Sequence, residues 1–524
     1  MPDPTDHVDT LRSALAAQGL ELVETHISLV ALGATEVWKI KKPVSLGFLD
    51  FGTLDKRRRA CEDEVRLNRR LAADVYLGVV PVTRSSDGLR LGGEGAPVEW
   101  AVHMRRLADD DRADQRLAAG RLEADDVAQL GRAIARFHRE CRSDAETARF
   151  GAPSAIAVNI DENFEQTRGK LEDFLSEPEA EEIEAWQRGF LADHAAELRR
   201  RVEQGRVRDG HGDLRLDHVY FEDRGLRIVD CIEFSDRLRY GDVCVDLAFL
   251  AMDLAWHERT DLAELLVAAY AEAANDYDLY PLLDFYESYR AFVRGKIATF
   301  TLDDPSLPEE TRSRLHAEAR RYFLLALASE RRPLDPPRIV AIGGWIGAGK
   351  STVAAGLARR FSSPVIAADR TRKSLLGVEP TRTVREPAFA GAYSPDATER
   401  VYREMLRRAR AVVGARRGVI LDASFRSRHL RGLARDLARE LAVPFTFVEC
   451  RTDEALLRRR LRERERTQTV SDGRLAILDD FIARWEPVDE LPPGQHVVVD
   501  TGEPLEAVLD RAEKAILRAE PDGA

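Results

Sequence analysis

Two aspartates on either side of a short hairpin are the first candidates for chemistry. Asp213 lies in the polar stretch 211–218, and Asp230 follows the strand–turn–strand pattern of residues 219–231. A carboxylate on such a loop can orient an acceptor hydroxyl and take its proton, while a second one across the hairpin can hold Mg²⁺ against nucleotide phosphates. The spacing therefore predicts phosphoryl transfer. The simpler alternative is a capped surface loop followed by an ordinary hairpin.

A lysine and a glutamate upstream fit the same chemistry. Residues 24–32 and 36–40 have strand patterns, and Lys39 and Lys41 share one face because side chains alternate along a strand. The helical pattern 54–72 carries Glu64. We expect Lys39 to contact the α- and β-phosphates and Glu64 to fix it, with Lys41 as the alternative to Lys39. An edge strand with solvent-facing lysines is the simpler explanation.

Residues 20–255 resemble the aminoglycoside phosphotransferase family, whose members share the protein-kinase fold. The order His-x-Asp, hairpin, Asp carries this resemblance, together with the motifs at 41–44, 47–51 and 64–71. It implies a bilobal kinase-like domain that binds ATP and Mg²⁺, with an N-lobe at 1–104 and a helical C-lobe at 105–332. The apolar link 98–104 would connect the lobes and place Met104 beside the nucleotide.

The sequence departs from the family pattern five residues after Asp213. The family has an Asn that binds Mg²⁺ there, whereas this chain has His218. By this correspondence His218 is the candidate at the metal site. Imidazole is a poor ligand for Mg²⁺, which prefers oxygen, so Asp217 could serve instead, the second ion could be held more loosely, or the domain binds ATP with weak turnover. Further on, Asp242 is expected to cap the next helix, as an anion at a positive helix end. Asn163 also matches a motif of a bacterial subgroup of the family, in which a second ATP-binding domain often follows.

A proline-rich linker at 333–337 precedes a second nucleotide motif. Residues 344–351 fit Gly-x₄-Gly-Lys-Ser/Thr between a strand and a helix. The glycines allow backbone N–H groups to face phosphates, Lys350 neutralises their charge, and Ser351 places a hydroxyl on Mg²⁺. The nucleotide contacts predicted here are Gly344, Gly347, Ala348, Gly349, Lys350, Ser351 and Thr352.

Two aspartates end the following strands of this domain. Asp422 follows the strand 419–421 and is expected to bind the Mg²⁺ water, since ligands gather at the carboxyl ends of parallel strands. Asp369 follows the strand 364–368 and suits an acceptor-side base, with Arg372 binding the acceptor. The alternative for Asp369 is a helix cap.

A basic helix further along carries Arg460 and Arg464, which share a face four residues apart. Such arginines can close over a transferring phosphate, or they can belong to a solvated helix face. With Ser471, Asp472 and the strand 497–501, residues 338–502 resemble P-loop kinases of the gluconate-kinase and polynucleotide-kinase type. The expected fold class is thus α/β and α+β multidomain, a bilobal kinase-like domain followed by a parallel P-loop domain at 338–524.

Composition limits the cellular setting. The 524 residues are 44% hydrophobic and 32% charged, and the net charge of −12 disfavours non-specific duplex binding by the whole chain. No stretch approaches the roughly 20 apolar residues of a spanning helix, and the N-terminus lacks a secretory pattern, so we expect a cytoplasmic protein with no membrane partner. The five cysteines form no close pair and are expected to be reduced. Acidic residues between 109 and 126 form either a solvated face or a docking surface for a cationic acceptor.

Together these patterns predict a bifunctional, ATP- and Mg²⁺-dependent phosphotransferase. Each domain would move a γ-phosphoryl group to a hydroxyl of a small polar molecule such as a sugar, aminosugar or nucleoside. One alternative is an ATP-binding regulatory protein with a weakly active or inactive kinase-like domain, which His218 favours. Another is 5′-hydroxyl kinase activity on nucleic acid by the P-loop domain, which its basic helix favours.

Overall fold

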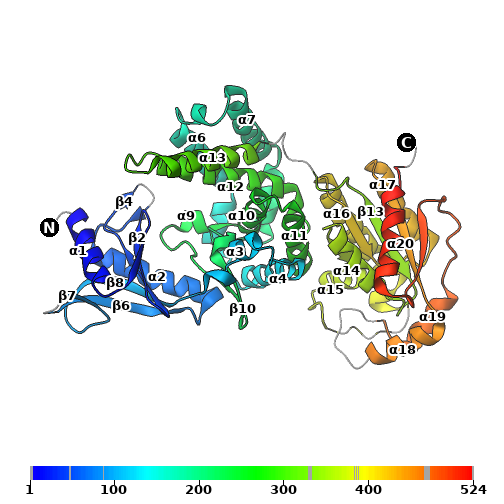
Figure 1. Cartoon of the computed structure of the whole chain (residues 1–524). Coiled ribbons are helices and arrows are strands. Elements are labelled where there is room, and N and C mark those ends of the chain that lie inside the picture. The colour runs from blue at the N-terminus through cyan, green and yellow to red at the C-terminus, as the bar shows by residue number, and fades with distance from the viewer. Residues whose placement is uncertain are drawn as a thin grey trace. The chain divides into compact units, whose positions relative to one another are not determined.

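The chain divides into two compact units (Figure 1). The computed structural model describes residues 4–46, 49–85, 88–327, 333–382, 384, 386, 389–464 and 473–521. The first unit comprises Met1–Asp126, Arg136–His257 and Phe285–Ala328, and the second comprises Val127–Ala135, Glu258–Asp284 and Ser329–Ala524.

The first unit begins with an antiparallel sheet of six strands. Their spatial order is β1-β2-β3-β8-β6-β7. The strands are β1 (Glu21–Glu24), β2 (Ser28–Leu32), β3 (Glu36–Lys41), β6 (Tyr76–Ser85), β7 (Gly88–Leu91) and β8 (Pro97–Arg105), and a separate small hairpin joins β4 (Ser45–Leu46) to β5 (Leu49–Asp50). The predicted apolar connector at 98–104 is therefore part of β8, which lies inside the sheet between β3 and β6.

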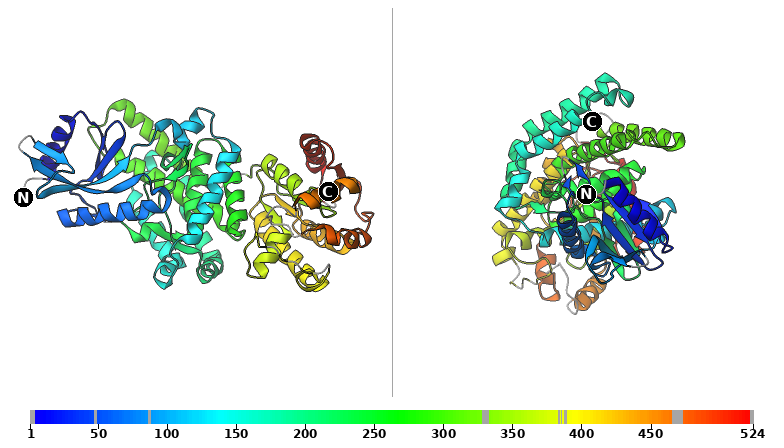
Figure 2. Two further views of the ribbon diagram at one scale, coloured as in Figure 1. Left: turned by 90° about the horizontal axis from the view of Figure 1, so that it is seen from below. Right: turned by 90° about the vertical axis from the view of Figure 1, so that its left-hand side faces the viewer.

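One helix covers each face of this sheet (Figure 2). Helix α1 (Pro4–Ala16) packs Leu15 against Ile40 and Ala101, while α2 (Leu54–Ala72) packs Val65 against Val102 on the other face. Alternation along β8 sends neighbouring residues 101 and 102 to opposite cores. The sheet is thus buried on both sides, which fixes the register of β3 and the side of the sheet that α2 occupies.

The rest of the chain before the linker is mostly helical, as predicted. A short hairpin pairs β10 (Val219–Glu222) with β11 (Gly225–Ile228), and β9 (Val207–Asp209) pairs with β12 (Tyr240–Asp242). The helices are α3 (Ala113–Ala118), α4 (Ala124–Glu140), α5 (Ala145–Ala148), α6 (Pro153–Thr167), α7 (Glu177–Asp193), α8 (Ala195–Glu203), α9 (Asp236–Arg239), α10 (Val243–Trp256), α11 (Thr260–Ala274), α12 (Tyr280–Thr301) and α13 (Glu309–Ala326).

Asp242 caps α10, as its position in the sequence predicts. Its side chain accepts a hydrogen bond from the Cys244 amide at 2.8 Å. It also receives two bonds from Arg201, at 2.6 and 2.7 Å, and both side chains are 2% exposed. The cap therefore joins α8 to the start of α10 through a buried ion pair.

The second unit is built on a parallel sheet in the order β14-β15-β13-β16-β17. Helices α14 and α20 cover one face, and α16 and α17 cover the other. The strands are β13 (Ile339–Gly344), β14 (Val365–Ala367), β15 (Val419–Asp422), β16 (Phe445–Arg451) and β17 (His496–Asp500). The helices are α14 (Lys350–Arg360), α15 (Ala368–Leu375), α16 (Pro395–Gly414), α17 (Arg428–Glu440), α18 (Glu454–Arg464), α19 (Leu478–Ala483) and α20 (Leu505–Arg518).

The second unit also includes the segment Glu258–Asp284. Tyr277 donates a hydrogen bond to the Val365 carbonyl of β14 at 2.6 Å. Arg417 pairs with Glu264 at 3.0 Å and with Asp284 at 2.8 Å. These contacts attach the segment to the strand β14 and to the residues that precede β15.

All five cysteines are buried and none forms a disulfide. Within the described residues, no helix combines the length and the apolar character that crossing a bilayer requires.

Candidate active sites

Two lysines of β3 and one glutamate of α2 form a buried ionic cluster. Lys39 Nζ lies 3.0 Å from a Glu64 oxygen and 2.5 Å from Asp230 Oδ1. Lys41 Nζ lies 2.5 Å from the other Glu64 oxygen and also binds Glu233. Alternation along β3 thus brings both lysines to the same glutamate, and the hairpin supplies Asp230 from 191 residues further along.

The two lysines differ in how open they are. The Lys41 side chain has no exposed area, whereas 14% of the Lys39 side chain is exposed. Burial opposes the charge on Lys39, but Asp230 and Glu64 outweigh it and raise the pKa of Lys39 well above its usual range. Burial likewise opposes ionisation of Glu64, and the two lysines lower the pKa of Glu64. Lys39 is therefore the better placed of the two to contact a phosphate, while Lys41 bridges two buried carboxylates.

Asp230 is held by neighbours on α2 and β6. Its backbone has φ +65°, an uncommon left-handed conformation that Asp tolerates better than most residues. Its amide donates to the Tyr76 hydroxyl at 3.1 Å, and the next amide, of Cys231, donates to Asn68 Oδ1 at 2.9 Å. Burial opposes ionisation, but the charges of Lys39 and His218 outweigh it and lower the pKa of Asp230. Asp230 therefore stays ionised.

Helix α10 anchors the loop that carries Asp213. Asp246 accepts hydrogen bonds from the amides of His211 at 2.7 Å and Gly212 at 2.8 Å. Asp253, two turns further along the helix, accepts one from the Leu216 amide at 2.9 Å. These carboxylates fix the loop at both ends. Burial lowers the pKa of His211 to about 4, so its imidazole is a neutral packing group at physiological pH.

Arg215 shares the loop with Asp213. Its Nε lies 3.3 Å from Asp213 Oδ1, and its Nη2 lies 2.9 Å from Asp217 Oδ2. Burial opposes ionisation of Asp213, but Arg215 and then His218 outweigh it and lower the pKa of Asp213. The carboxylate is thus ionised, so it can accept a hydrogen bond from the hydroxyl of an acceptor and then take its proton.

His218 occupies the position where an oxygen ligand is expected. Its Nδ1 lies 2.7 Å from the Asp213 carbonyl oxygen, and its Nε2 lies 3.3 Å from Arg215 Nη2. Nε2 also lies 3.7 Å from Asp230 Oδ2. Beside it, Asp217 Oδ1 is buried and has no hydrogen-bond partner in the described part of the chain. That carboxylate oxygen suits Mg²⁺ better than the imidazole does.

The glycine-rich loop of the second unit leaves backbone amides open. Gly347 has φ +82° and Gly349 has φ +77°, values that glycine adopts readily. The amides of Ile346, Gly347 and Gly349 donate to no other described residue. Gly344 starts the loop with φ +135°, and a Cβ there would lie 2.3 Å from the Cys450 carbonyl oxygen. The loop, which immediately precedes the N-terminus of α14, therefore has unsatisfied N–H donors from which a phosphate can accept hydrogen bonds.

Lys350 and Ser351 face Asp422 at the carboxyl end of β15. Ser351 Oγ donates to Asp422 Oδ2 at 2.6 Å, and Lys350 Nζ donates to the Trp345 carbonyl at 2.8 Å. The parallel pairing of Ile342 with Asp422 brings the two motifs together. Burial lowers the pKa of Lys350 and raises that of Asp422. A hydroxyl and a carboxylate at this spacing are the protein oxygens that a P-loop Mg²⁺ site needs.

Asp369 and Arg372 pair with each other within α15. Arg372 Nη1 donates to Asp369 Oδ1 at 2.8 Å, and Arg372 also donates to the Ala392 carbonyl and lies over the Tyr393 ring at 4.4 Å. Asp369 lies in the first turn of the helix, whose N-cap residue is Ala367, so it is not the cap. Its charge acts on both Lys350 and Asp422, which places it beside the phosphate loop.

The two arginines of α18 also lie near this loop. Arg460 donates to the Thr501 hydroxyl at 3.0 Å and the Thr501 carbonyl at 2.7 Å, and Thr501 in turn donates to the Ala348 carbonyl at 2.9 Å. The charge of Arg464 acts on Lys350 and Asp422. Both arginines therefore approach the phosphate loop, Arg460 with its guanidinium already bound to Thr501.

The remaining predicted residues fall outside these clusters. Met104 packs with the apolar residues between α2 and the sheet, and Thr352 is exposed on the first turn of α14. Ser471 and Asp472 lie outside the described residues. In the described part of the chain, no three His, Cys, Asp or Glu side chains come together as a metal cluster.

Several residues that shape the first site were not predicted from the sequence. They are Asn68, Tyr76, Arg215, Glu233, Asp246 and Asp253. Arg215 and Glu233 lie within three residues of Asp213 and Asp230, so proximity was an available signal. The others act on the site from distant elements, and no local pattern marks them.

Comparison with known families covers both halves. Residues 47–286 match the model of a phosphotransferase enzyme family, and residues 339–488 match that of an AAA domain. An uncharacterized protein of Mycobacterium tuberculosis (strain ATCC 25618 / H37Rv) is 33% identical over 435 residues, which is 82% of this chain and 83% of that protein. A protein of Mycobacterium bovis (strain ATCC BAA-935 / AF2122/97) matches equally well.

Solved structures resemble each half separately. A gluconokinase from Sinorhizobium meliloti 1021 is 22% identical and covers 35% of this chain and 93% of its own, with a TM-score of 0.27. A choline/ethanolamine kinase family protein from Mesorhizobium loti is 15% identical and covers 61% of this chain and 99% of its own, with a TM-score of 0.36. The match to the mycobacterial proteins shows that the chain belongs to the same family as they do. By the two family models, the chain combines a kinase-like domain of the phosphotransferase enzyme family with a P-loop AAA domain.

Proposed function

We propose that the protein is a bifunctional phosphotransferase in which each domain moves the γ-phosphoryl group of ATP to a hydroxyl of a small polar acceptor. Sugars, aminosugars and nucleoside-like molecules are the acceptor classes we favour. The observation that carries the proposal is the contact of Lys39 with both Glu64 and Asp230. In phosphoryl transfer this arrangement positions phosphates and a metal together.

In the kinase-like domain we assign each residue a role from its contacts. Lys39 would bind the α- and β-phosphates, held in place by Glu64. Asp230 and the buried oxygen of Asp217 would hold Mg²⁺, which supplies charge neutralisation at the phosphates. Asp213 would orient the acceptor hydroxyl and take its proton, and its lowered pKa keeps it in the accepting form at neutral pH.

In the P-loop domain the open amides of Ile346, Gly347 and Gly349 would bind phosphate oxygens with Lys350. Ser351 and Asp422 would hold the metal directly and through water, as their hydrogen bond suggests. Asp369 would act as the acceptor-side base with Arg372 beside it, and Arg460 and Arg464 would neutralise charge on the transferring group.

The test is turnover of γ-labelled ATP by Asp213→Asn, Lys350→Ala and the double variant, with D-gluconate, D-glucosamine and adenosine as acceptors. Loss of a positioned base lowers the rate by roughly 10²–10⁴-fold. We expect Asp213→Asn to remove one acceptor-dependent activity and Lys350→Ala the other. Asp223→Asn, on an exposed hairpin turn, and Lys514→Ala, on the exposed side of α20, are matched controls. Wild-type rates in both single variants would refute the assignment of the sites.

His218 supports a second candidate, a kinase-like domain that binds ATP mainly to regulate. Its Nε2 faces Asp230 and is already engaged by Arg215. Calorimetry with Mg-ATP on Lys350→Ala, beside a hydrolysis assay on the same variant, separates the two. Binding without turnover would select the regulatory role, and turnover would exclude it.

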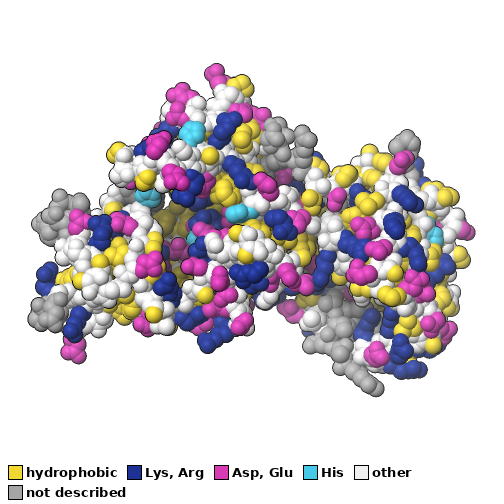
Figure 3. All heavy atoms as spheres, viewed as in Figure 1, with side chains coloured by type: hydrophobic (Ala, Val, Ile, Leu, Met, Phe, Trp, Pro, Cys, Tyr) yellow, Lys and Arg dark blue, Asp and Glu magenta, His cyan; other side chains and the backbone are white. Residues whose placement is uncertain are grey.

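We favour small molecules over nucleic acid at the P-loop domain. Arg458 of α18 is paired with Glu454 at 2.6 Å and with Asp479 at 2.5 Å, and Arg460 is bound to Thr501. Acidic and basic side chains are intermingled on the face shown in Figure 3. Oligonucleotide binding that falls steeply with salt would contradict this choice.

A further inference from the structure

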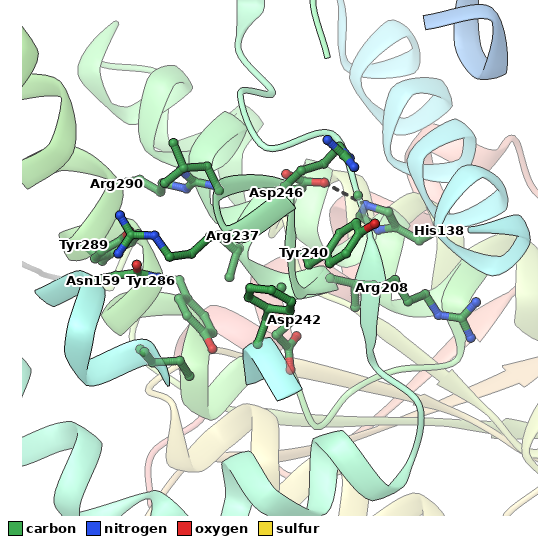
Figure 4. A pocket seen from close by; sticks show the side chains of 18 residues that line it. His138, Asn159, Arg208, Arg237, Tyr240, Asp242, Asp246, Tyr286, Tyr289 and Arg290 are labelled. Atoms are coloured by element: carbon green, nitrogen blue, oxygen red, sulfur yellow. Dashed lines mark hydrogen bonds and ion pairs between the residues drawn. The ribbon is translucent and has the colours of Figure 1, made fainter. Parts of the chain in front are cut away.

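A small pocket of the first unit lies behind the loop that carries Asp213. It offers about 50 Å³ in which the centre of a water molecule fits. Roughly 10–15 Å³ of such space is enough for one water, so the pocket has room for several waters or one small ion. Its polar walls come from α6, α12 and the segments around β9 and β12 (Figure 4).

The walls of the pocket are more positive than negative. Four arginines and two aspartates line it. Both aspartates already have partners, because Asp242 is bound twice by Arg201, and Asp246 accepts from His138 at 3.2 Å and from two loop amides. The two carboxylates are therefore largely neutralised within the fold, and the arginines determine what else the pocket attracts.

Three of the four arginines are also satisfied. Arg237 pairs with Glu162 at 2.7 Å, and Arg239 pairs with Asp209 at 2.7 Å. Arg208 donates to backbone carbonyls. These three hold the walls together.

Arg290 is the exception. It is 6% exposed, and it has neither a hydrogen bond nor an ion pair with any residue that the structure describes. Its guanidinium lies over the rings of Phe249 at 4.6 Å and Tyr289 at 5.7 Å. Of the donor atoms of Arg290, Nε is buried without an acceptor among the described residues, and a donor that loses its water without gaining a partner is costly. Asn159 of α6, which Figure 4 shows close to Tyr289, has a buried carbonyl oxygen without a partner in the described residues, Oδ1.

We infer that this pocket is a binding site for a small oxyanion, a carboxylate or a phosphate group, with Arg290 as its main ligand. A planar guanidinium donates two parallel hydrogen bonds to such groups, and stacking on two rings orients its plane. The anion would also lie beside Asp246, the carboxylate that holds the catalytic loop through the amides of His211 and Gly212. No residue of this site has a role in the proposed phosphoryl transfer.

Calorimetric titration of the full chain tests the site without any turnover. The chain is first saturated with Mg-ADP, so that the nucleotide sites are filled, and is then titrated in low chloride with inorganic phosphate and, separately, with acetate. We expect at least one anion to bind, and Arg290→Met to weaken it by roughly tenfold or more, because a charged hydrogen-bonding partner is lost. Arg224→Met, on the exposed hairpin turn, should bind as the wild type does. Tighter binding of phosphate or of acetate identifies the class of the natural ligand.

A second variant covers the case in which Arg290→Met fails to fold. Asn159→Asp puts a carboxylate of nearly the same size and shape on the pocket wall. The fold should therefore be retained, and the added negative charge should repel an anion and abolish its binding. If neither anion binds the wild type, or if binding survives unchanged in both variants, Arg290 is satisfied by ring stacking alone and the inference is overturned.

Discussion

Replacing Lys39 by Met isolates the ionic cluster that joins the sheet to the hairpin. The substitution keeps an apolar stem of similar length and removes one charge, so it tests the ion pairs rather than the packing. Asp230 would lose the lysine 2.5 Å away, while Glu64 would keep Lys41, also at 2.5 Å. The result therefore depends mainly on Asp230.

The expected loss of stability is about 3 kcal/mol at pH 7. Removing one partner of a buried pair costs about 3–5 kcal/mol, and an exposed pair contributes about 1 kcal/mol or less. Glu64 has no exposed area, but the Asp230 side chain is 43% exposed, so solvent screens part of the interaction. We therefore place the cost at the low end of the range for buried pairs.

The pH dependence of this loss has a defined sign. In the wild type the pKa of Asp230 is lowered, so its contribution to stability is complete above the ordinary pKa of 3.8 and is lost as the pH falls below it. Burial opposes this shift, and Lys39 is the largest of the charges that outweigh it, so removing Lys39 raises the pKa of Asp230 from its lowered value. The folded variant then binds more protons than the folded wild type in this pH range, so it gains less stability than the wild type as the pH rises. The gap between variant and wild type should widen from pH 4 to pH 7.

The assay is hydrogen–deuterium exchange of the β3 and α2 peptides across a urea series at both pH values. These peptides report the unfolding of this lobe alone, which a global probe of a chain with two units would not. Lys42→Met is the matched control, because Lys42 pairs with the partly exposed Glu24 at 2.6 Å. Equal losses in the two variants, or a gap that narrows toward pH 7, would refute the reasoning.

Three further changes have defined outcomes. Gly344→Ala puts a Cβ 2.3 Å from a carbonyl oxygen and should abolish ATP binding at the P-loop, which ATP titration checks. Its control is Gly432→Ala inside α17, where a Cβ would meet no atom within 4 Å. That change should stabilise the folded protein by about 0.5–1 kcal/mol, which thermal melts check. Arg201→Met leaves a buried carboxylate without its cation and should cost about 3–5 kcal/mol in urea unfolding, against less than about 0.5 kcal/mol for Arg200→Met, whose side chain is 57% exposed. Burial lowers the pKa of His211 from 6.5 to about 4, so on acidification the unfolded state takes up the proton first. About 3 kcal/mol of folding stability should therefore be lost between those two pH values. His211→Gln should flatten this dependence of stability on pH, and an unchanged dependence would contradict the burial argument.

Sites formed by residues that are close together in the sequence could be predicted from the sequence alone. The P-loop needs only local backbone conformations, and its partner Asp422 ends a neighbouring parallel strand, where the rule for α/β sheets places ligands. The pairing of Lys39 with Glu64 is predicted by the kinase-like order of strands and helix, while alternation along the strand leaves Lys41 as an alternative.

Residues that act across the fold could not be predicted in this way. Asn68 and Tyr76 fix the backbone around Asp230 from α2 and β6, and only the assembled lobe brings them there. The apolar run 98–104 was interpreted as a connector because alternation is hidden when both faces of a strand are buried; it is a strand of the sheet. Arg290 has no counter-charge among the residues that the structure describes, and a sequence pattern cannot show that a counter-charge is missing.

The most direct test of two separate nucleotide sites is the stoichiometry of a non-hydrolysable ATP analogue with Mg²⁺, measured by equilibrium dialysis. The structure predicts two molecules bound per chain, and one per chain after Lys350→Ala, since the cluster of Lys39, Glu64 and Asp230 is independent of the P-loop. A single molecule bound to the wild type, or a stoichiometry that Lys350→Ala leaves unchanged, would contradict this account.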